Sequence, residues 1–146
     1  NHFHEYLEDG GKSIFLIENY LGGVYHLTAD EVLHERGKYI IQESKNTTKN
    51  FLPSISDVKD GLFKLILFAN LHSLKVKGRE VKFTTRLKLT GYKLKESIQL
   101  PCEKLELDKF VKVNKISTGQ LKTLNALNLE ATHNKNLTIE IRGNNG

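Results

Sequence analysis

The sequence predicts an α/β (α+β) fold, with a mixed central sheet, an N-terminal antiparallel strand meander and flanking helices. Three observations predict it. Several short segments alternate apolar and polar residues, which is the pattern of half-buried strands. Two longer segments repeat apolar residues at helical spacing. The first strands follow one another directly, and a helix separates them from a further strand.

The bulk properties of the chain limit its class. Its 146 residues fit one domain of common size, so we expect 1–146 to form a single domain. The chain has no methionine, which indicates a fragment of a longer protein. No apolar run reaches the roughly 18 residues of a membrane span. The single Cys102 argues against an internal disulfide framework and a cysteine-based zinc site, and it favours a reducing compartment.

The first third of the chain predicts an antiparallel meander. Residues 12–23, 24–37 and 38–44 each carry a strand pattern. Glycine-containing pairs at residues 22–23 and 36–37 separate these segments, and such pairs favour hairpin turns. We therefore expect three consecutive strands, each paired with the next.

A buried helix is expected after a polar loop that contains Pro53. Ser56 is a suitable N-cap, and Asp57 and Asp60 lie in the first turn, where a carboxylate favours the helix dipole. Apolar residues extend nearly all round the segment, so we expect a helix buried on most sides that runs to about Leu74. These residues are Val58, Leu62, Phe63, Leu65, Ile66, Leu67, Phe68 and Ala69.

Residues 80–91 alternate cleanly, which predicts a half-buried strand with a basic outer side. One side of this strand carries Val81, Phe83, Thr85, Leu87 and Leu89, and the other carries Lys82, Thr84, Arg86 and Lys88. Farther along, residues 92–100 predict a strand, residues 117–130 a helix capped by Ser117 or Thr118, and residues 137–143 a last strand.

The third strand ends in Glu43-Ser44-Lys45. Side chains alternate along a strand, so Glu43 and Lys45 share one face. If Arg36-Gly37 is a two-residue turn, Glu35 pairs with Lys38, and the same register places Asp30 opposite Glu43. A four-residue turn keeps this face relationship, whereas a three-residue turn breaks it.

Two carboxylates on one face, with cross-strand Cβ atoms about 5 Å apart, repel each other unless a cation lies between them. Mg²⁺ is the simplest such cation, because it takes one or two carboxylates together with water and phosphate oxygens. Lys45 beside them can orient a water molecule or bind phosphate. By the same register Glu31 lies opposite Gln42 on the other face, and we interpret that pair as structural.

The "TAD" of residues 28–30, followed by "ESK" at 43–45, a loop, a buried helix and a strand, resembles the PD-(D/E)XK nuclease superfamily. Within it the chain is most similar to the restriction endonuclease branch, over residues 13–89. The chain departs from the family name at Ala29, where the family has proline.

The resemblance implies a restriction endonuclease-like fold and a Mg²⁺-dependent endonuclease, with Mn²⁺ able to substitute. It implies Asp30, Glu43 and Lys45 as catalytic residues. Asp30 and Glu43 match the two metal-binding acids, and the carbonyl of Ser44 completes the metal shell. Lys45 matches the lysine that positions the attacking water. A prokaryotic, cytoplasmic type II restriction enzyme or its catalytic domain is the protein that this implies, and a homodimer is its expected assembly.

The net charge of +5 favours a polyanionic partner. Under the nuclease hypothesis that partner is double-stranded DNA, with Lys82, Arg86 and Lys88 along its phosphates. Two alternatives stay open from the sequence. The first is a basic domain that binds nucleic acid without cutting it, and the second is a structural or protein-interaction domain with a solvated basic surface.

Overall fold

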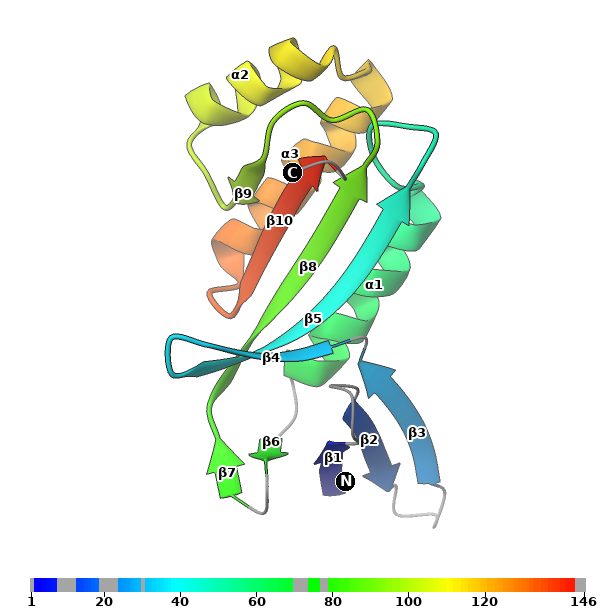
Figure 1. The fold of residues 1–146 in the computed structure, drawn as a ribbon, viewed down its shortest axis with the longest axis vertical. Helices are drawn as coiled ribbons and strands as arrows, with labels where there is room; N and C mark the ends of the chain where they lie inside the picture. Colours follow the sequence, from blue (N-terminus) through cyan, green and yellow to red (C-terminus); the bar gives the residue numbers. More distant parts are fainter. Residues whose placement is uncertain are drawn as a thin grey trace.

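The computed structural model describes the backbone of residues 2–7, 13–18, 24–29, 31–69, 74–76 and 79–143, and the side chains of 31–69, 79 and 81–143. The elements in chain order are β1 His2–Leu7, β2 Ser13–Glu18, β3 Val24–Ala29, β4 Glu31–Glu35, β5 Lys38–Thr47, α1 Ile55–Ala69, β6 Leu74–Val76, β7 Arg79–Val81, β8 Phe83–Gly91, β9 Ile98–Leu100, α2 Lys104–Asn114, α3 Thr118–His133 and β10 Leu137–Gly143 (Figure 1).

A five-stranded mixed sheet organises the molecule, with strand order β4-β5-β8-β10-β9. The three central strands run parallel, and the two edge strands, β4 and β9, run antiparallel to their neighbours. Helix α1 packs on β5 and β8, and α3 packs on β10 and β9, both behind the sheet as drawn in Figure 1. The predicted α+β class with a mixed sheet and flanking helices is therefore confirmed.

The hydrophobic core lies between the sheet and these two helices. Alternate residues of the central strands face the helices, so the sheet's contribution to the core comes from every second position. The fully buried core side chains are Ile41, Leu65, Phe68, Leu87, Leu89, Leu100, Leu124, Leu137, Ile139 and Ile141. We call this side of the sheet the helix-side face and the opposite side the outer face.

The predicted two-residue turn between β4 and β5 is confirmed. Glu35 pairs with Lys38, and Glu31 pairs with Gln42. Arg36 and Gly37 have φ values of 50° and 77°, the left-handed conformation that two-residue hairpins require. The turn therefore has the parity that the sequence hypothesis needs, although Asp30 itself lies outside the described residues.

Later elements also follow the sequence. Ser117 caps α3, since its side chain accepts a hydrogen bond from the backbone N–H of Gln120, and the Gln120 side chain completes a capping box. Strand β10 has the predicted bounds, whereas only Ile98–Leu100 of the strand predicted at 92–100 forms a strand, β9. Helix α2 carries no matching prediction.

Five expectations are wrong. The strand expected at 80–91 is interrupted at Lys82: β7 pairs with β6 in a two-stranded sheet, and β8 begins at Phe83 in the five-stranded sheet. Residues 24–37 form two strands rather than one, and these belong to different sheets: β3 joins a three-stranded sheet with β1 and β2, whereas β4 begins the five-stranded sheet. Helix α1 begins at Ile55, and the hydroxyl of Ser54, not Ser56, accepts a hydrogen bond from the backbone N–H of Asp57 at 3.2 Å. Leu74 lies in β6. The helix is also buried on one side only, because Phe63 is 61% exposed.

Candidate functional site

Strand β5 places Glu43 and Lys45 on the helix-side face, in line with Ile41. Glu43 is fully buried, and the side chain of Lys45 is 21% exposed. The predicted sharing of one face by these two residues is confirmed, because both side chains contact residues of α1. The acid therefore lies inside the helix–sheet layer, and the lysine lies where that layer meets solvent.

Helix α1 contributes two charged side chains to the same place. The ammonium of Lys45 lies 2.8 Å from Oδ2 of Asp60. The ammonium of Lys64, one helical turn farther on, lies 3.8 Å from the same Asp60 oxygen and 3.9 Å from Oε2 of Glu43. The pKa of Asp60 is lowered, first by its hydrogen bond and charge interaction with Lys45 and then by the charge of Lys64. We call these four residues the β5–α1 cluster.

The close approach of α1 to the sheet at Gly61 makes this cluster possible. A Cβ atom at residue 61 would lie 2.9 Å from Cδ1 of Leu87 and 3.5 Å from Cε of Lys45. Glycine removes that obstacle, so the stem of Lys45 can pass along the helix backbone and reach Asp60. The glycine that interrupts the apolar pattern of the helix therefore sets the spacing of the site.

The cluster lies where β5 continues past its antiparallel partner. Strand β5 pairs with β4 up to Gln42, but it stays paired with β8 up to Thr47. Within the part of the chain that the structure describes, no strand pairs with the β4 side of residues 43–47. The site is thus near an edge of the five-stranded sheet.

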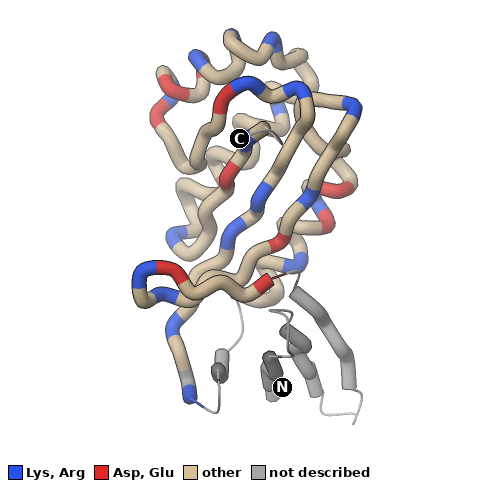
Figure 2. The backbone as a smooth tube through the Cα atoms, viewed as in Figure 1, with Lys and Arg blue, Asp and Glu red and all other residues tan. Residues whose placement is uncertain are grey.

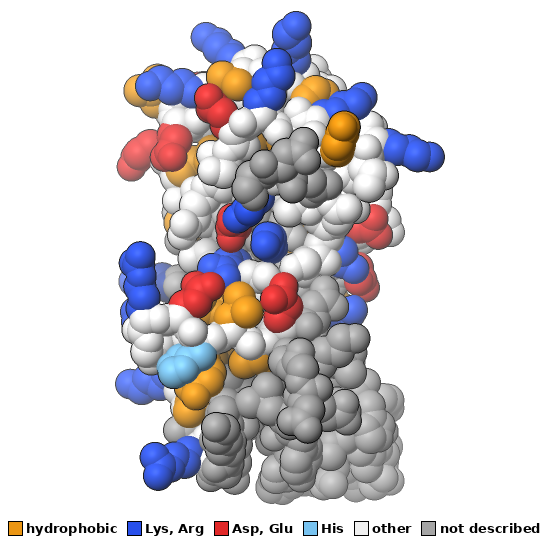
Figure 3. Space-filling model, viewed as in Figure 1, with side chains coloured by type: hydrophobic (Ala, Val, Ile, Leu, Met, Phe, Trp, Pro, Cys, Tyr) orange, Lys and Arg blue, Asp and Glu red, His pale blue; other side chains and the backbone are white. Residues whose placement is uncertain are grey.

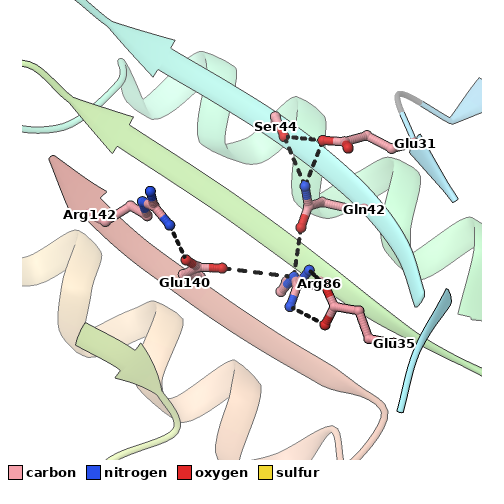
Figure 4. Close-up of polar contacts among 7 residues, drawn as sticks. All are labelled: Glu31, Glu35, Gln42, Ser44, Arg86, Glu140 and Arg142. Atoms are coloured by element: carbon pink, nitrogen blue, oxygen red, sulfur yellow. Dashed lines mark hydrogen bonds and ion pairs between the residues drawn. The ribbon is translucent and has the colours of Figure 1, made fainter. Parts of the chain in front are cut away.

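Ser44 faces the other way. Its hydroxyl donates a hydrogen bond to Oε1 of Glu31 at 3.2 Å on the outer face (Figure 4). The main-chain carbonyl of Ser44, which lies between Glu43 and Lys45 in the chain, is the group that the family resemblance assigns to the metal. Asp30, the other expected metal ligand, is outside the described residues.

The outer face carries a network of short-range polar contacts across four strands (Figure 4). Buried Gln42 donates to Oε1 of Glu31 at 2.6 Å and accepts from Nε of Arg86 at 2.6 Å. The guanidinium of Arg86 also pairs with Glu35 at 3.1 Å and lies 3.9 Å from Glu140. The predicted pairing of Glu31 with Gln42 is confirmed.

This network changes the interpretation of the basic strand. The hydrogen bond and positive charge of Arg86 lower the pKa of Glu35. Figure 2 marks acidic and basic residues on strands of the sheet, and Figure 3 shows acidic and basic side chains next to one another on this face. A phosphate group would have to compete with Glu35 and Glu140 for Arg86.

The other two expected DNA-binding residues lie apart from each other. Lys88 lies on β8 two residues beyond Arg86 and therefore shares the outer face. Lys82 precedes β8, is exposed, and lines a cavity of about 540 Å³ with Tyr39 and Phe83 at the amino ends of β5 and β8. The three residues therefore do not form one continuous basic row.

The oxygen donors of the cluster fit a hard divalent cation. Glu43 and Asp60 both lie within 4 Å of the ammonium of Lys64, and Mg²⁺ commonly takes one or two carboxylates with water. Among the described residues no group of three or more histidine, cysteine, aspartate or glutamate side chains is gathered. The described part of the site therefore supplies two carboxylates.

Sequence reasoning missed Asp60 and Lys64 as site residues. It assigned Asp60 to the helix dipole alone and gave Lys64 no role. Their i, i+4 spacing around Gly61 was the available signal, because Gly61 belongs to the buried stripe of α1 and its flanking residues border the sheet.

Comparisons of the chain with family models, curated proteins and solved structures find no match. None of the described helices combines the length and apolarity needed to cross a bilayer.

Proposed function

We propose that this chain is the catalytic domain of a Mg²⁺-dependent DNA endonuclease of the type II restriction kind. The observation that carries the proposal is the β5–α1 cluster, in which a buried carboxylate and a lysine share one face near a sheet edge. The two-residue turn supports the proposal, because a turn of this length is what the expected pairing of Asp30 with Glu43 requires.

Each side chain has a role in this proposal. Lys45 is held at 2.8 Å by Asp60 and is partly exposed, so its ammonium can orient a water molecule or a phosphate oxygen at the edge. Glu43 and the carbonyl of Ser44 would hold the metal, with Asp30 as the further ligand. A bound Mg²⁺ or Mn²⁺ would supply charge stabilisation for phosphodiester hydrolysis.

Double-stranded DNA is the proposed partner. The net charge of +5 supports association with a polyanion, and Lys82 and Lys88 are the proposed phosphate contacts. Arg86 is proposed to contribute only where phosphate competes with its acidic neighbours.

Cleavage of supercoiled plasmid tests the proposal. We expect cutting with Mg²⁺ or Mn²⁺ and none with a chelator. Glu43→Gln and Lys45→Met should each slow cutting at least about 100-fold, the usual scale for loss of one such group. Glu103→Gln and Lys49→Met, at exposed positions outside the cluster, should cut like the unaltered chain. Cutting by Glu43→Gln at the original rate would overturn the proposal.

A second candidate is a nucleic-acid-binding domain that does not cut. The complete burial of Glu43 beneath α1 favours it, since a buried acid with a nearby lysine can be purely structural. This candidate predicts salt-dependent DNA binding that is unchanged by metal and by Glu43→Gln. Binding measured by fluorescence anisotropy at several salt concentrations, beside the plasmid assay, separates the two.

The proposed homodimer has a candidate surface on α1. Phe63 is 61% exposed and Ile66 is 36% exposed, and they are three residues apart on the side of α1 turned away from the sheet. Sedimentation should show a dimer for the unaltered chain and a monomer for Phe63→Ser. A monomer in both cases would remove the dimer from the proposal.

A further inference from the structure

Lys64 has a position in the β5–α1 cluster that the proposed cleavage does not use. Its ammonium lies 3.9 Å from Glu43 and 3.8 Å from Asp60, between two carboxylates from different elements. Its side chain is 34% exposed, while Glu43 is fully buried. The ammonium therefore brings a positive charge from the solvent boundary to an acid inside the protein.

The positive charge of Lys64 affects the energy of the buried Glu43 carboxylate. An ionised carboxylate in a low-dielectric layer is costly unless a cation is close to it. A divalent cation held by Glu43 would meet that need. It would also repel an ammonium that stays beside the same carboxylate. The two cations therefore compete for Glu43.

The side chain of Lys64 is suited to giving up its place. It contacts Glu43 at a distance longer than a hydrogen bond, and it also contacts Asp60, which is 52% exposed. A lysine has four rotatable bonds and a strongly hydrated head, so withdrawal into solvent along an exposed helix is inexpensive.

We propose that Lys64 is a resident counter-cation of Glu43 that gives up this contact when a divalent metal binds, and so sets the metal affinity of the site. This inference rests on the proposed metal-dependent function. A simpler role, an i, i+4 pair with Asp60 on the helix surface, would affect stability only slightly and leave metal affinity unchanged.

Calorimetric titration of the whole chain with Mn²⁺ tests the inference without any activity. Lys64→Met keeps the stem and removes the charge, and it should bind Mn²⁺ roughly tenfold more tightly, within the usual range for coupled sites. Lys64→Arg keeps the charge and should stay close to the unaltered chain. Lys59→Met, an exposed lysine of the same helix outside the cluster, is the matched control.

A second measurement uses the metal-free protein. With a chelator present, Lys64→Met should lower the melting temperature, and Glu43→Gln added to it should recover part of the loss. Additive effects of the two changes would overturn the counter-cation role, as would equal or weaker Mn²⁺ binding by Lys64→Met. The counter-cation role would also be overturned if neither the unaltered chain nor Lys64→Met binds Mn²⁺.

The plasmid assay keeps this inference separate from the proposed function. Cutting by the unaltered chain, together with unchanged Mn²⁺ affinity in Lys64→Met, would reject the inference and leave the nuclease proposal standing. Tighter Mn²⁺ binding by Lys64→Met without cutting by any chain would reject the nuclease and leave the exchange of Lys64 for metal supported.

Discussion

The two faces of β5 make different kinds of contact through alternating residues of one strand. On the helix-side face, Glu43 and Lys45 meet long, partly exposed charged side chains from α1 at distances up to 3.9 Å. On the outer face, Gln42 is fixed by contacts of 2.6 Å on both sides. The helix-side arrangement joins a strand to a helix through ion pairs. The outer-face arrangement joins strands through hydrogen bonds.

The largest effect should distinguish the two faces by chemistry. Glu43→Gln should reduce DNA cutting at least about 100-fold, because it removes the negative charge of the proposed metal ligand. Glu31→Gln, the matched change on the outer face, should leave the cutting rate per folded molecule nearly unchanged. If Glu43→Gln and Glu31→Gln lost equal fractions of the initial cutting rate, the proposed functional difference between the two faces would be wrong.

A larger residue at Gly61 should disturb only the helix-side face. Gly61→Leu would drive side-chain atoms into Leu87 and the stem of Lys45, so we expect a loss of about 1–3 kcal/mol in unfolding free energy. Cutting by the remaining folded protein should also fall. Gly119→Ala in α3, where a Cβ meets nothing within 4 Å, is the control and should gain up to about 1 kcal/mol in denaturant unfolding.

Removing the central amide should weaken the outer face. Gln42→Leu leaves Glu31 and Arg86 each without a hydrogen-bond partner that they have in the folded chain. We expect unfolding free energy to fall by about 1–3 kcal/mol, measured with urea. A neutral result would mean that water replaces the amide at no cost.

The smallest effect should appear at low pH. Arg86 holds the pKa of Glu35 below its ordinary value of 4.5, so the folded state favours the ionised form. The stabilisation is present above pH 4.5 and is lost as the pH falls through the lower pKa of the folded state. Glu35→Gln should therefore flatten the acid side of the melting-temperature profile, and a profile identical to that of the unaltered chain would contradict this.

Local rules made half of the cluster predictable. Alternation along β5 and the Arg36-Gly37 turn involve only neighbouring residues, so the common face of Glu43 and Lys45 followed from the sequence. Asp60 and Lys64 join them only because α1 approaches the sheet at Gly61, and this phase of a helix against a distant strand is a tertiary property.

The wrong predictions have the same origin. Ser54 and Ser56 are equally good capping residues, and the position of α1 on the sheet decides between them. The apolar circumference of α1 predicted burial on most sides, but the described sheet covers one side and leaves Phe63 exposed. Membership of β3 and β4 in different sheets leaves no mark on an alternating pattern.

The two-residue turn at Arg36-Gly37 also sets which side chains of β4 and β5 lie on the same face of the sheet. Side chains alternate with a period of two, so one residue added to β4 beside an unchanged two-residue turn would move every earlier side chain of β4 to the opposite face relative to β5. Glu31 would leave Gln42 and face the helices, whereas two inserted residues would restore the original sides. With the turn held at two residues, only an even number of added residues keeps the side chains of β4 on their present faces.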